Sequence, residues 1–322
     1  MTAKEYIITT IEALKEPLPF IETGDISLEN AVYSKVMSKK FRKLKPAELC
    51  VNMTKKAIDI AVSESKPIRI VEMFGGNKLW RFEEAPEIDW AELFSLTYFL
   101  QWARLISSVY KPGVIFEYLS QDVSVQTLNN IPRHETDKYS DTFKDLIRFI
   151  EPYLPSNISV NYTRHYDLFE DPESYYAEME IAKSEVLREN NGNLPILTEV
   201  MKAATELNVK LTPGQADDPL WREKVELEHQ AIFKTKTLRE YCDAEDIIWT
   251  CPTFYPDCVV TGSTKRSLAK FWAAVGVLKK ENNTYAELVL TPRQLEKATF
   301  TWEDIQIEGL KGKNFKRIRI ID

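Results

Sequence analysis

The most constraining feature of this sequence is the order of strand-like and helix-like segments in its first half. Residues 68–74, Ile-Arg-Ile-Val-Glu-Met-Phe, have the composition of a β-strand and run directly into two glycines. A capping box, Asp89 followed three residues later by Glu92, opens an amphipathic helix that ends near Tyr110. A second strand is predicted at 114–119. This order is typical of βαβ units, so we predict an α/β fold with a Rossmann-like, mostly parallel sheet.

The remaining sequence divides into parts around this unit. Residues 1–65 are predicted to form a helical N-terminal cover, and 66–168 the Rossmann-like α/β core. Residues 169–245 have a helical pattern throughout, which predicts a helical insertion or second lobe. Residues 246–322 return to strand composition, and we expect this C-terminal α/β portion to complete the core. Further expected elements are a helix at about 141–153, strands at 158–163, 247–250 and 259–261, a helix from Thr264, and a closing hairpin of 305–307 with 317–321.

Charge and composition exclude several classes of protein. The chain has 42 Lys+Arg and 49 Asp+Glu, a formal net charge of −7, which argues against a generic binder of nucleic acid. Every apolar run is interrupted well short of the ~20 residues that cross a bilayer, and the first residues lack a signal-peptide pattern. We therefore expect a cytoplasmic protein that acts on small molecules, without a membrane or nucleic-acid partner. The four cysteines form no C-x-x-C pair; we expect free thiols and no metal site, although Cys251 and Cys258 with a distant histidine remain an alternative.

Two loops contain residues suited to binding an anion. The loop after the first strand contains Gly75, Gly76, Asn77, Lys78 and Arg81. Exposed N–H groups, an amide and two cations at a strand end are able to hold a phosphate or a carboxylate. A second loop carries Lys265 and Arg266 where a helix is expected to begin, and a helix N-terminus also favours anions. Either loop can instead be a turn with solvated charges, but if both converge they form a pocket for a doubly anionic substrate.

Three further candidates follow the ends of predicted strands. Asp122 is a candidate general base, with a turn-capping carboxylate as the alternative. Arg164 is a candidate anion ligand, and His165 is a candidate proton carrier because a histidine titrates near neutral pH. A lone histidine is more often structural, and His229 is expected to be a solvated helix residue. The sequence contains neither G-x-S-x-G nor H-E-x-x-H, which disfavours a nucleophile-elbow hydrolase and a zinc peptidase.

Aromatic residues gather in the same part of the chain. They are Trp80, Trp90, Tyr98, Trp102 and Tyr118. They are able to line a pocket for an aromatic substrate, but core packing is the more common role of such a cluster.

Between residues 68 and 150 the chain carries an ordered series of short motifs. They are Gly75-Gly76-Asn77-Lys78, Pro86-Glu87, Asp89 with Glu92, Tyr110 with Pro112-Gly113, and Ser120-Gln121-Asp122. In this order the motifs resemble the isocyanide synthase family, also called the pyoverdine/dityrosine biosynthesis family. The next helix is similar too, at Tyr139, Phe143 and Leu146. The chain departs from the family where a strand ends in Ser-Gln-Asp in place of Ser-Asp-Gly.

The resemblance implies a modified Rossmann-like enzyme of small-molecule biosynthesis. Such an enzyme joins an amino acid, usually tyrosine or tryptophan, with ribulose 5-phosphate and converts the amine into an isonitrile, without a metal or nicotinamide cofactor. In that picture Asn77, Lys78 and Arg81 would hold one anion. Lys265 and Arg266 would hold the other, and Asp122 or His165 would move protons during imine formation.

Two other classes of function remain open at this point. A transferase using a nucleotide-activated sugar or phosphoryl donor would also need a Rossmann-like sheet and basic loops, with a divalent ion at Asp122 or a neighbouring carboxylate. A non-catalytic interaction protein would use the long helical segment as a partner surface.

Overall fold

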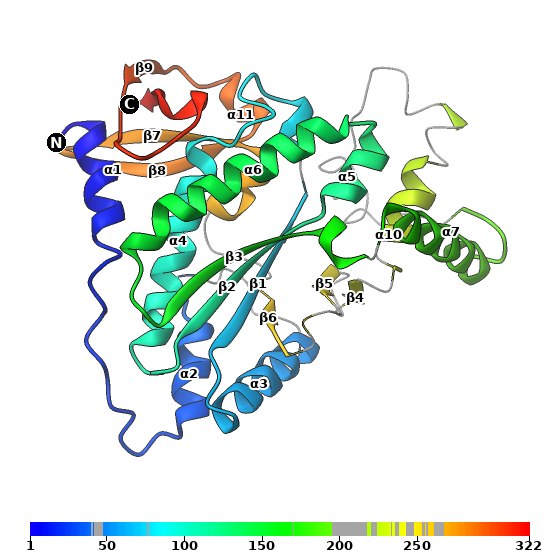
Figure 1. Ribbon diagram of the computed structural model, residues 1–322, viewed down its shortest axis with the longest axis horizontal. Coiled ribbons are helices and arrows are strands. Elements are labelled where there is room, and N and C mark those ends of the chain that lie inside the picture. Colours follow the sequence, from blue (N-terminus) through cyan, green and yellow to red (C-terminus); the bar gives the residue numbers. More distant parts are fainter. Residues whose placement is uncertain are drawn as a thin grey trace.

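The computed structural model shows a parallel sheet and a second, mostly antiparallel sheet with helices packed between and around them (Figure 1). It describes residues 1–39, 41, 48–75, 77–169, 171–194, 218–219, 224–232, 234–235, 238–242, 248–252, 255, 257–260 and 267–322.

The parallel sheet confirms the predicted α/β fold. Its strands, in spatial order, are β3 (Ile158–Arg164), β2 (Val114–Ser120), β1 (Ile68–Phe74) and β6 (Val259–Val260). All three neighbouring pairs are parallel. The carboxyl ends of these strands therefore lie at one edge of the sheet, where α/β folds bind ligands.

The N-terminal part is helical, as predicted. Its helices are α1 (Ala3–Glu12), α2 (Leu28–Val36) and α3 (Glu48–Ser63). The helix α3 packs against β1 and β6, whereas α1 contacts the second sheet. Figure 1 shows the N-terminus and the C-terminus near each other at that end of the molecule.

The helix α4 (Trp90–Ser107) connects β1 to β2 and lies between the two sheets. It begins at the predicted capping box, where the Asp89 side chain accepts from Ala91 N and Asp89 N donates to the Glu92 carboxylate. Nearly all of its side chains are buried because the parallel sheet covers one side and the second sheet the other. The helix is therefore a shared core element rather than a surface helix.

Two helices connect β2 to β3, where the sequence predicted one. They are α5 (Asp122–Asn129) and α6 (Arg133–Ile150), followed by the short 3₁₀ helix η2 (Glu151–Tyr153). The helix α6 begins earlier than the expected residue 141, because the polar run after Pro132 already buries Thr136 and Tyr139 on its inner face. The helix therefore includes the polar segment that precedes residue 141.

The C-terminal part differs from the prediction. The expected helix from Thr264 is, in its described portion, the short 3₁₀ helix η6 (Ser267–Ala273), and a strand follows at once. The second sheet has the order β8 (Thr284–Leu290), β7 (Val275–Glu281), β10 (Arg317–Ile321), β9 (Thr301–Asp304). The partner of β10 is β9 and not the predicted 305–307, because Ile305 and Ile307 are buried in the core beyond the end of the ladder.

The predicted helical segment 169–245 is helical only in part. Its described helices are α7 (Pro172–Glu189), the π-helix η5 (Lys224–Glu228) and α10 (His229–Ile232), which share a small core. At its end, β4 (Leu238–Cys242) pairs antiparallel with the next strand, β5 (Ile248–Pro252), so strand pairing overrides the helical pattern there. Residues 195–217 of this prediction lie outside the described residues. The other short elements are η1 (Asn77–Trp80), η3 (His165–Leu168), α11 (Pro292–Leu295) and η7 (Lys313–Phe315).

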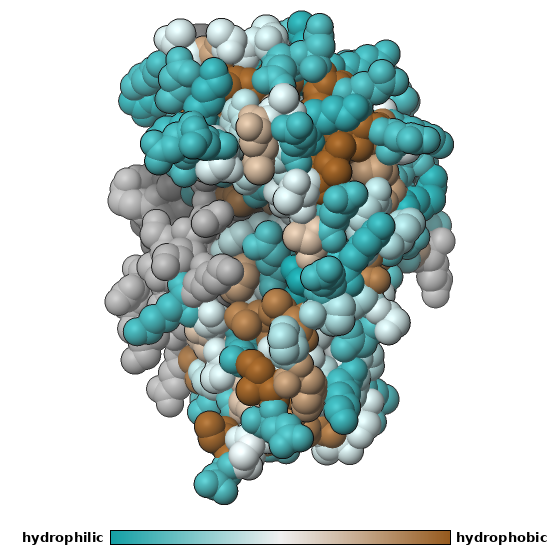
Figure 2. Space-filling view, turned by 90° about the vertical axis from the view of Figure 1, so that its left-hand side faces the viewer, coloured by the Kyte–Doolittle hydropathy of each residue, from teal (hydrophilic) through white to brown (hydrophobic). Residues whose placement is uncertain are grey.

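The aromatic side chains serve mainly as core. Trp90, Tyr98, Trp102 and Tyr118 are all buried, which supports core packing as their role; the Trp80 side chain lies outside the described residues. Polar residues cover most of the side shown in Figure 2, and hydrophobic residues gather in smaller patches. Among the exposed large hydrophobic side chains, Leu18, Phe20, Ile21 and Ile26 lie in the connection between α1 and α2.

Candidate active site at the carboxyl edge of the parallel sheet

Three strands of the parallel sheet end side by side. Phe74 of β1 is in register with Ser120 of β2, and Ser120 is in register with Arg164 of β3. The backbone N–H of Gln121 donates to the Phe74 carbonyl over 2.8 Å, so the chain turns immediately after the ladder. The structure thus brings the loops that follow β1, β2 and β3 to the same edge.

Arg164 is held by two carboxylates at this edge. Its Nε donates to Asp122 Oδ2 over 2.5 Å, and its Nη1 donates to Asp137 Oδ1 over 2.6 Å. Burial lowers the pKa of Arg164, but Asp122 and Asp137 outweigh it and raise the pKa above its ordinary value. The guanidinium is therefore always charged. With both carboxylates ionised, the three groups carry a net charge of −1.

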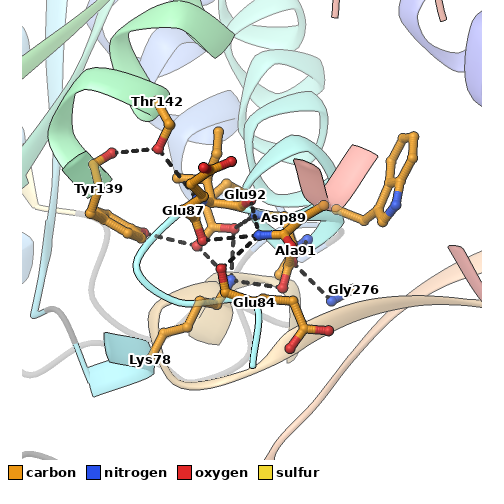
Figure 3. Close-up of polar contacts among 12 residues, drawn as sticks. Lys78, Glu84, Glu87, Asp89, Ala91, Glu92, Tyr139, Thr142 and Gly276 are labelled. Atoms are coloured by element: carbon orange, nitrogen blue, oxygen red, sulfur yellow. Dashed lines mark hydrogen bonds and ion pairs between the residues drawn. The ribbon is translucent and has the colours of Figure 1, made fainter. Parts of the chain in front are cut away.

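Lys78 lies at the centre of a second polar cluster, shown in Figure 3. Its ammonium donates to both oxygens of Glu92 at 2.7 Å and lies 3.2 Å from Asp89 Oδ2. Tyr139 OH donates to Glu92 Oε1 over 2.8 Å, and Gly276 N donates to Asp89 Oδ1 over 3.2 Å. We call these residues, Lys78, Asp89, Glu92 and Tyr139, the Lys78 cluster. All four side chains are buried, and they come from η1, the start of α4 and α6.

Burial sets the proton affinities in the Lys78 cluster. It raises the pKa of Glu92 to about 7, although Lys78 acts in the opposite direction. Burial also raises the pKa of Asp89, and it raises that of Tyr139 well above the ordinary value. For Lys78, burial lowers the pKa but the attraction of Asp89 and Glu92 is larger, so its pKa is raised. The cluster therefore contains a carboxyl group that exchanges a proton near neutral pH, held between an ammonium and a phenol.

An open hollow of about 400 Å³ lies next to the elements that hold this cluster. Leu79, Arg81, Phe82, Ala85, Pro86 and Glu135 line it. Leu79 and Arg81 flank Lys78 in the chain, and Glu135 lies one helical turn before Tyr139 on α6. Arg81 is half-buried, and burial lowers the pKa of its guanidinium. A hollow of this size fits a small molecule, and its lining carries one cation, Arg81, and one carboxylate, Glu135.

The remaining predicted site residues are placed as follows. Gly75 is buried at the end of β1, and Asn77 begins η1, although its side chain lies outside the described residues. Gly76, Lys265 and Arg266 also lie outside the described residues, so whether the two basic loops converge stays a prediction.

His165 lies just after Arg164 but faces aromatic rings. Its ring centroid is 5.4 Å from that of Phe169 and 5.6 Å from that of Tyr175. Burial lowers the pKa of His165 to about 4, so its imidazole is neutral at pH 7. His229 is also buried, and not solvated as expected, with its pKa lowered to about 4 by burial.

Sequence reasoning missed the part that Glu92 and Tyr139 play. Glu92 was interpreted only as the second half of a capping box, and Tyr139 only as a family-like helix position. The available signal was the surroundings of Glu92, a carboxylate in an almost entirely apolar helix, because such a residue needs a buried partner.

Comparison with known proteins supports the fold. Neither a protein-family model nor a curated protein matches the chain. The crystal structure of the PvcA protein from Pseudomonas aeruginosa is similar, with a TM-score of 0.57 and 14% sequence identity over 92% of this chain and 100% of that chain. At this identity the likeness shows a common fold and a remote resemblance only.

Among the described residues, no helix is long and apolar enough to cross a membrane. Within the described ranges, no group of three or more His, Cys, Asp or Glu side chains is arranged to hold a metal ion.

Proposed function

We propose that this protein is a biosynthetic enzyme similar to isocyanide synthases, which joins the amine of an amino acid to the carbonyl of ribulose 5-phosphate on the way to an isonitrile or a related N-modified amino acid. The proposal rests mainly on the buried carboxylate of Glu92. Its buried carboxylate has a pKa raised to about 7 by burial and contacts both Lys78 and Tyr139. It lies at the ligand-binding edge of a fold that resembles PvcA.

The first step of this reaction requires proton transfers. The free amine attacks the ketone carbon, the carbonyl π electrons move to oxygen, and a proton passes from nitrogen to that oxygen. Loss of the oxygen as water, with the second amine proton, leaves a C=N bond. A general acid and base whose pKa lies near the working pH performs such transfers best. Glu92 has this pKa, and in the proposal it exchanges the proton while Lys78 and Tyr139 stabilise its ionised form.

Asp122 is the second proposed proton carrier. Arg164 holds its carboxylate in place over 2.5 Å, which keeps one oxygen oriented. Because Arg164 also bonds to Asp137, we assign it to positioning Asp122, and not to binding the substrate phosphate by itself. His165 remains the alternative carrier, but its lowered pKa makes it a weaker base at pH 7 than a histidine in water.

The proposed substrate anions need separate cations. Arg81 lines the hollow beside the Lys78 cluster and is the described cation best placed to bind a phosphate or carboxylate there. Lys78 is fully paired inside the cluster, so in the proposal it acts through Glu92. Lys265 and Arg266 are proposed to bind the second anion. We also propose that the enzyme acts in the cytoplasm.

The test is direct. The purified protein is incubated with each standard amino acid and ribulose 5-phosphate, and products are followed by mass spectrometry and by the infrared band of an isonitrile. We expect one or a few amino acids to be consumed together with the sugar phosphate. Glu92→Gln and Asp122→Asn should each slow this by about 10²–10⁴-fold, the usual contribution of a general acid or base. Arg148→Met, an exposed change on α6, is the control and should leave the rate unchanged.

A parallel titration separates the main alternative. Nucleotide sugars with Mg²⁺ are added to the same protein, and the melting temperature is measured. A raised melting temperature without consumption of any amino acid would contradict the proposal and favour a transferase. Consumption of an amino acid that Glu92→Gln and Asp122→Asn do not affect would support the reaction but contradict the site.

A further inference from the structure

The loop between η1 and α4, residues 81–89, forms most of the hollow beside the Lys78 cluster. The residues of this loop that line the hollow are Arg81, Phe82, Ala85 and Pro86. Within the loop, backbone hydrogen bonds of 3.2 Å run from Ala85 N to the Phe82 carbonyl and from Glu87 N to the Glu84 carbonyl. Two such turns do not fix a segment of this length, so the shape of the hollow depends on contacts between the loop and other elements.

Asn314, in η7 of the C-terminal part, donates to three carbonyl groups of this loop. Its Nδ2 lies 2.8 Å from the carbonyl oxygen of Glu84, 3.0 Å from that of Ile88 and 3.4 Å from that of Glu87. An amide nitrogen has two hydrogens, so one of them is shared between two carbonyls. A single side chain thus ties together both ends of the segment 84–88, from a position 226–230 residues away in the chain.

The three acceptors also explain why the residue is an asparagine. They surround one end of the side-chain amide, so this end is the nitrogen and not the oxygen. An aspartate has nearly the same shape, but an ionised carboxylate only accepts hydrogen bonds. It would place a negative oxygen against three carbonyl oxygens, whereas an alanine would only remove the donor. Aspartate in place of Asn314 should therefore disturb the loop more than alanine does.

Asp89, the last residue of the loop, is held by other groups. Its Oδ1 accepts from Ala91 N over 2.6 Å and from Gly276 N over 3.2 Å, and its own N–H donates to the Glu92 carboxylate over 2.8 Å. Figure 3 shows Asp89 with these three partners. None of these contacts involves Asn314. Loss of the Asn314 amide should therefore release the lining of the hollow and leave the Lys78 cluster in place.

We propose that Asn314 is a positioning residue of the candidate active site, which holds residues 84–88 in the conformation that shapes the hollow for its ligand. Asn314 does not itself line the hollow among the described residues, so it acts through the loop. Its effect on substrate binding rests on the proposed function, in which Arg81 of this loop binds a substrate anion. Its hold on the loop does not rest on that function.

Amide hydrogen exchange of the intact protein tests the hold on the loop. Exchange is followed by mass spectrometry in peptides that cover residues 81–88. We expect it to be at least about tenfold faster in Asn314→Ala, because each lost hydrogen bond contributes a factor of about 2–10. In Asn314→Asp it should be faster still. Unchanged exchange in Asn314→Ala, or a milder effect of Asn314→Asp than of Asn314→Ala, would overturn the proposal.

A matched control and a second measurement keep this test specific. The side-chain amide of Asn157 donates to the Lys111 carbonyl over 3.2 Å at the opposite, amino edge of the parallel sheet. Asn157→Ala should therefore leave exchange in residues 81–88 unchanged. Should Asn314→Ala fail to fold, nuclear magnetic resonance of the unchanged protein decides. The side-chain amide protons of Asn314 should be protected from exchange with water, and freely exchanging protons would overturn the proposal.

Steady-state kinetics with the amino acid and ribulose 5-phosphate test the positioning role. Because Glu92 and Asp122 keep their partners, Asn314→Ala should raise the KM of at least one substrate by at least about tenfold and change kcat by less than about threefold. Asn157→Ala should change neither. A fall in kcat at unchanged KM, or no change in either, would overturn the positioning role. If the unchanged protein consumes no amino acid, the proposed function fails, and the exchange measurement still decides whether Asn314 holds the loop.

Discussion

The carboxylate of Glu92 and the hydroxyl of Tyr139 share a 2.8 Å hydrogen bond, although the two residues are 47 positions apart in the chain and belong to different helices. Both side chains are shielded from solvent: Glu92 is fully buried and Tyr139 is 3% exposed. The bond therefore depends on how the first turn of α4 and the helix α6 are positioned relative to each other. Lys78, from the 3₁₀ helix η1, binds the same carboxylate. Residues from three elements, η1, α4 and α6, therefore meet at Glu92.

The pKa of Glu92 predicts a specific pH dependence of stability. Its folded-state pKa, about 7, lies above the ordinary value of 4.5, so the folded protein binds this proton more tightly than the unfolded chain. The stabilisation is complete below pH 4.5 and is lost as the pH rises through 7. Relative to Glu92→Gln, the free energy of unfolding should fall by about 3 kcal/mol over this range. Urea unfolding of both proteins at several pH values measures the difference, and a difference that does not change with pH would contradict the raised pKa.

His165 predicts the opposite behaviour in acid. Burial lowers its pKa from 6.5 to about 4, so the unfolded chain takes up a proton that the folded protein excludes. The stabilisation is complete above pH 6.5 and is lost as the pH falls towards 4, by about 3 kcal/mol. In His165→Gln, thermal unfolding should depend less on pH in this range. His134→Gln at an exposed position is the control, and equal effects of the two changes would refute the explanation by burial.

Lys78→Met tests the balance of charges inside the Lys78 cluster. The substitution leaves Asp89 and Glu92 buried without their cation, and loss of one partner of a buried ion pair typically costs about 3–5 kcal/mol. The loss measured by urea unfolding should be larger at pH 8 than at pH 5, because the carboxyl groups are then more fully ionised. Lys280→Met, at an exposed position on β7, should change stability by less than about 0.5 kcal/mol. A similarly small change for Lys78→Met would show that the cluster does not need its ammonium.

The two carboxylates that hold Arg164 should contribute differently to activity. The Asp122 side chain is 5% exposed, whereas that of Asp137 is 40% exposed. In the proposed reaction Asp122 transfers a proton, so Asp122→Asn should lower the rate of amino-acid consumption by about 10²–10⁴-fold. Asp137→Asn removes only a partly solvated contact to Arg164, so its effect should be less than about tenfold. Equal losses in both variants would assign the effect to Arg164 and not to proton transfer by Asp122.

Gly113 precedes β2 and should tolerate no side chain. Its φ is +83°, and a Cβ atom would lie 1.7 Å from the Asn157 carbonyl oxygen, which accepts from Val114 N at the start of the ladder. Gly24 has a φ of +56° but open space around it. Gly24→Ala should therefore cost only the backbone strain, about 1–2 kcal/mol, and Gly113→Ala clearly more. Chemical denaturation of both variants compares them, and equal costs would mean that the backbone at Asn157 moves aside easily.

The predicted parts of the fold are those where local signals agree with the tertiary structure. The strand β1 and the capped start of α4 were recognised because Ile68–Phe74 has strand composition and Asp89 is followed by Glu92. The second sheet was missed because the apolar run leading into β7 is buried on both faces and shows no alternation. The strand β4 was missed because its residues were assigned to the helical pattern of 169–245, although the strand that pairs with it, β5, was predicted at 247–250.

The same distinction applies to the candidate site. Lys78, Asp122 and Arg164 were identified because polar residues that follow parallel strands meet at one edge. Asp137 and Tyr139 were not, because they lie on a helix whose start was not recognised. Pairing between buried charges depends on distances between elements, and a periodic pattern carries no information about those distances.

The position of α4 between two sheets limits which substitutions this helix can accept during evolution. A helix covered on one side leaves its other side open to nearly neutral substitutions, but α4 contacts β2 and β3 on one side and β7 and β8 on the other. At Gly276 the strand β7 comes so near that a Cβ atom would lie 2.4 Å from Ala91 N. Residues 90–107 must therefore satisfy both sheets at once, so the parallel sheet and the C-terminal sheet are expected to be inherited together and not as exchangeable modules.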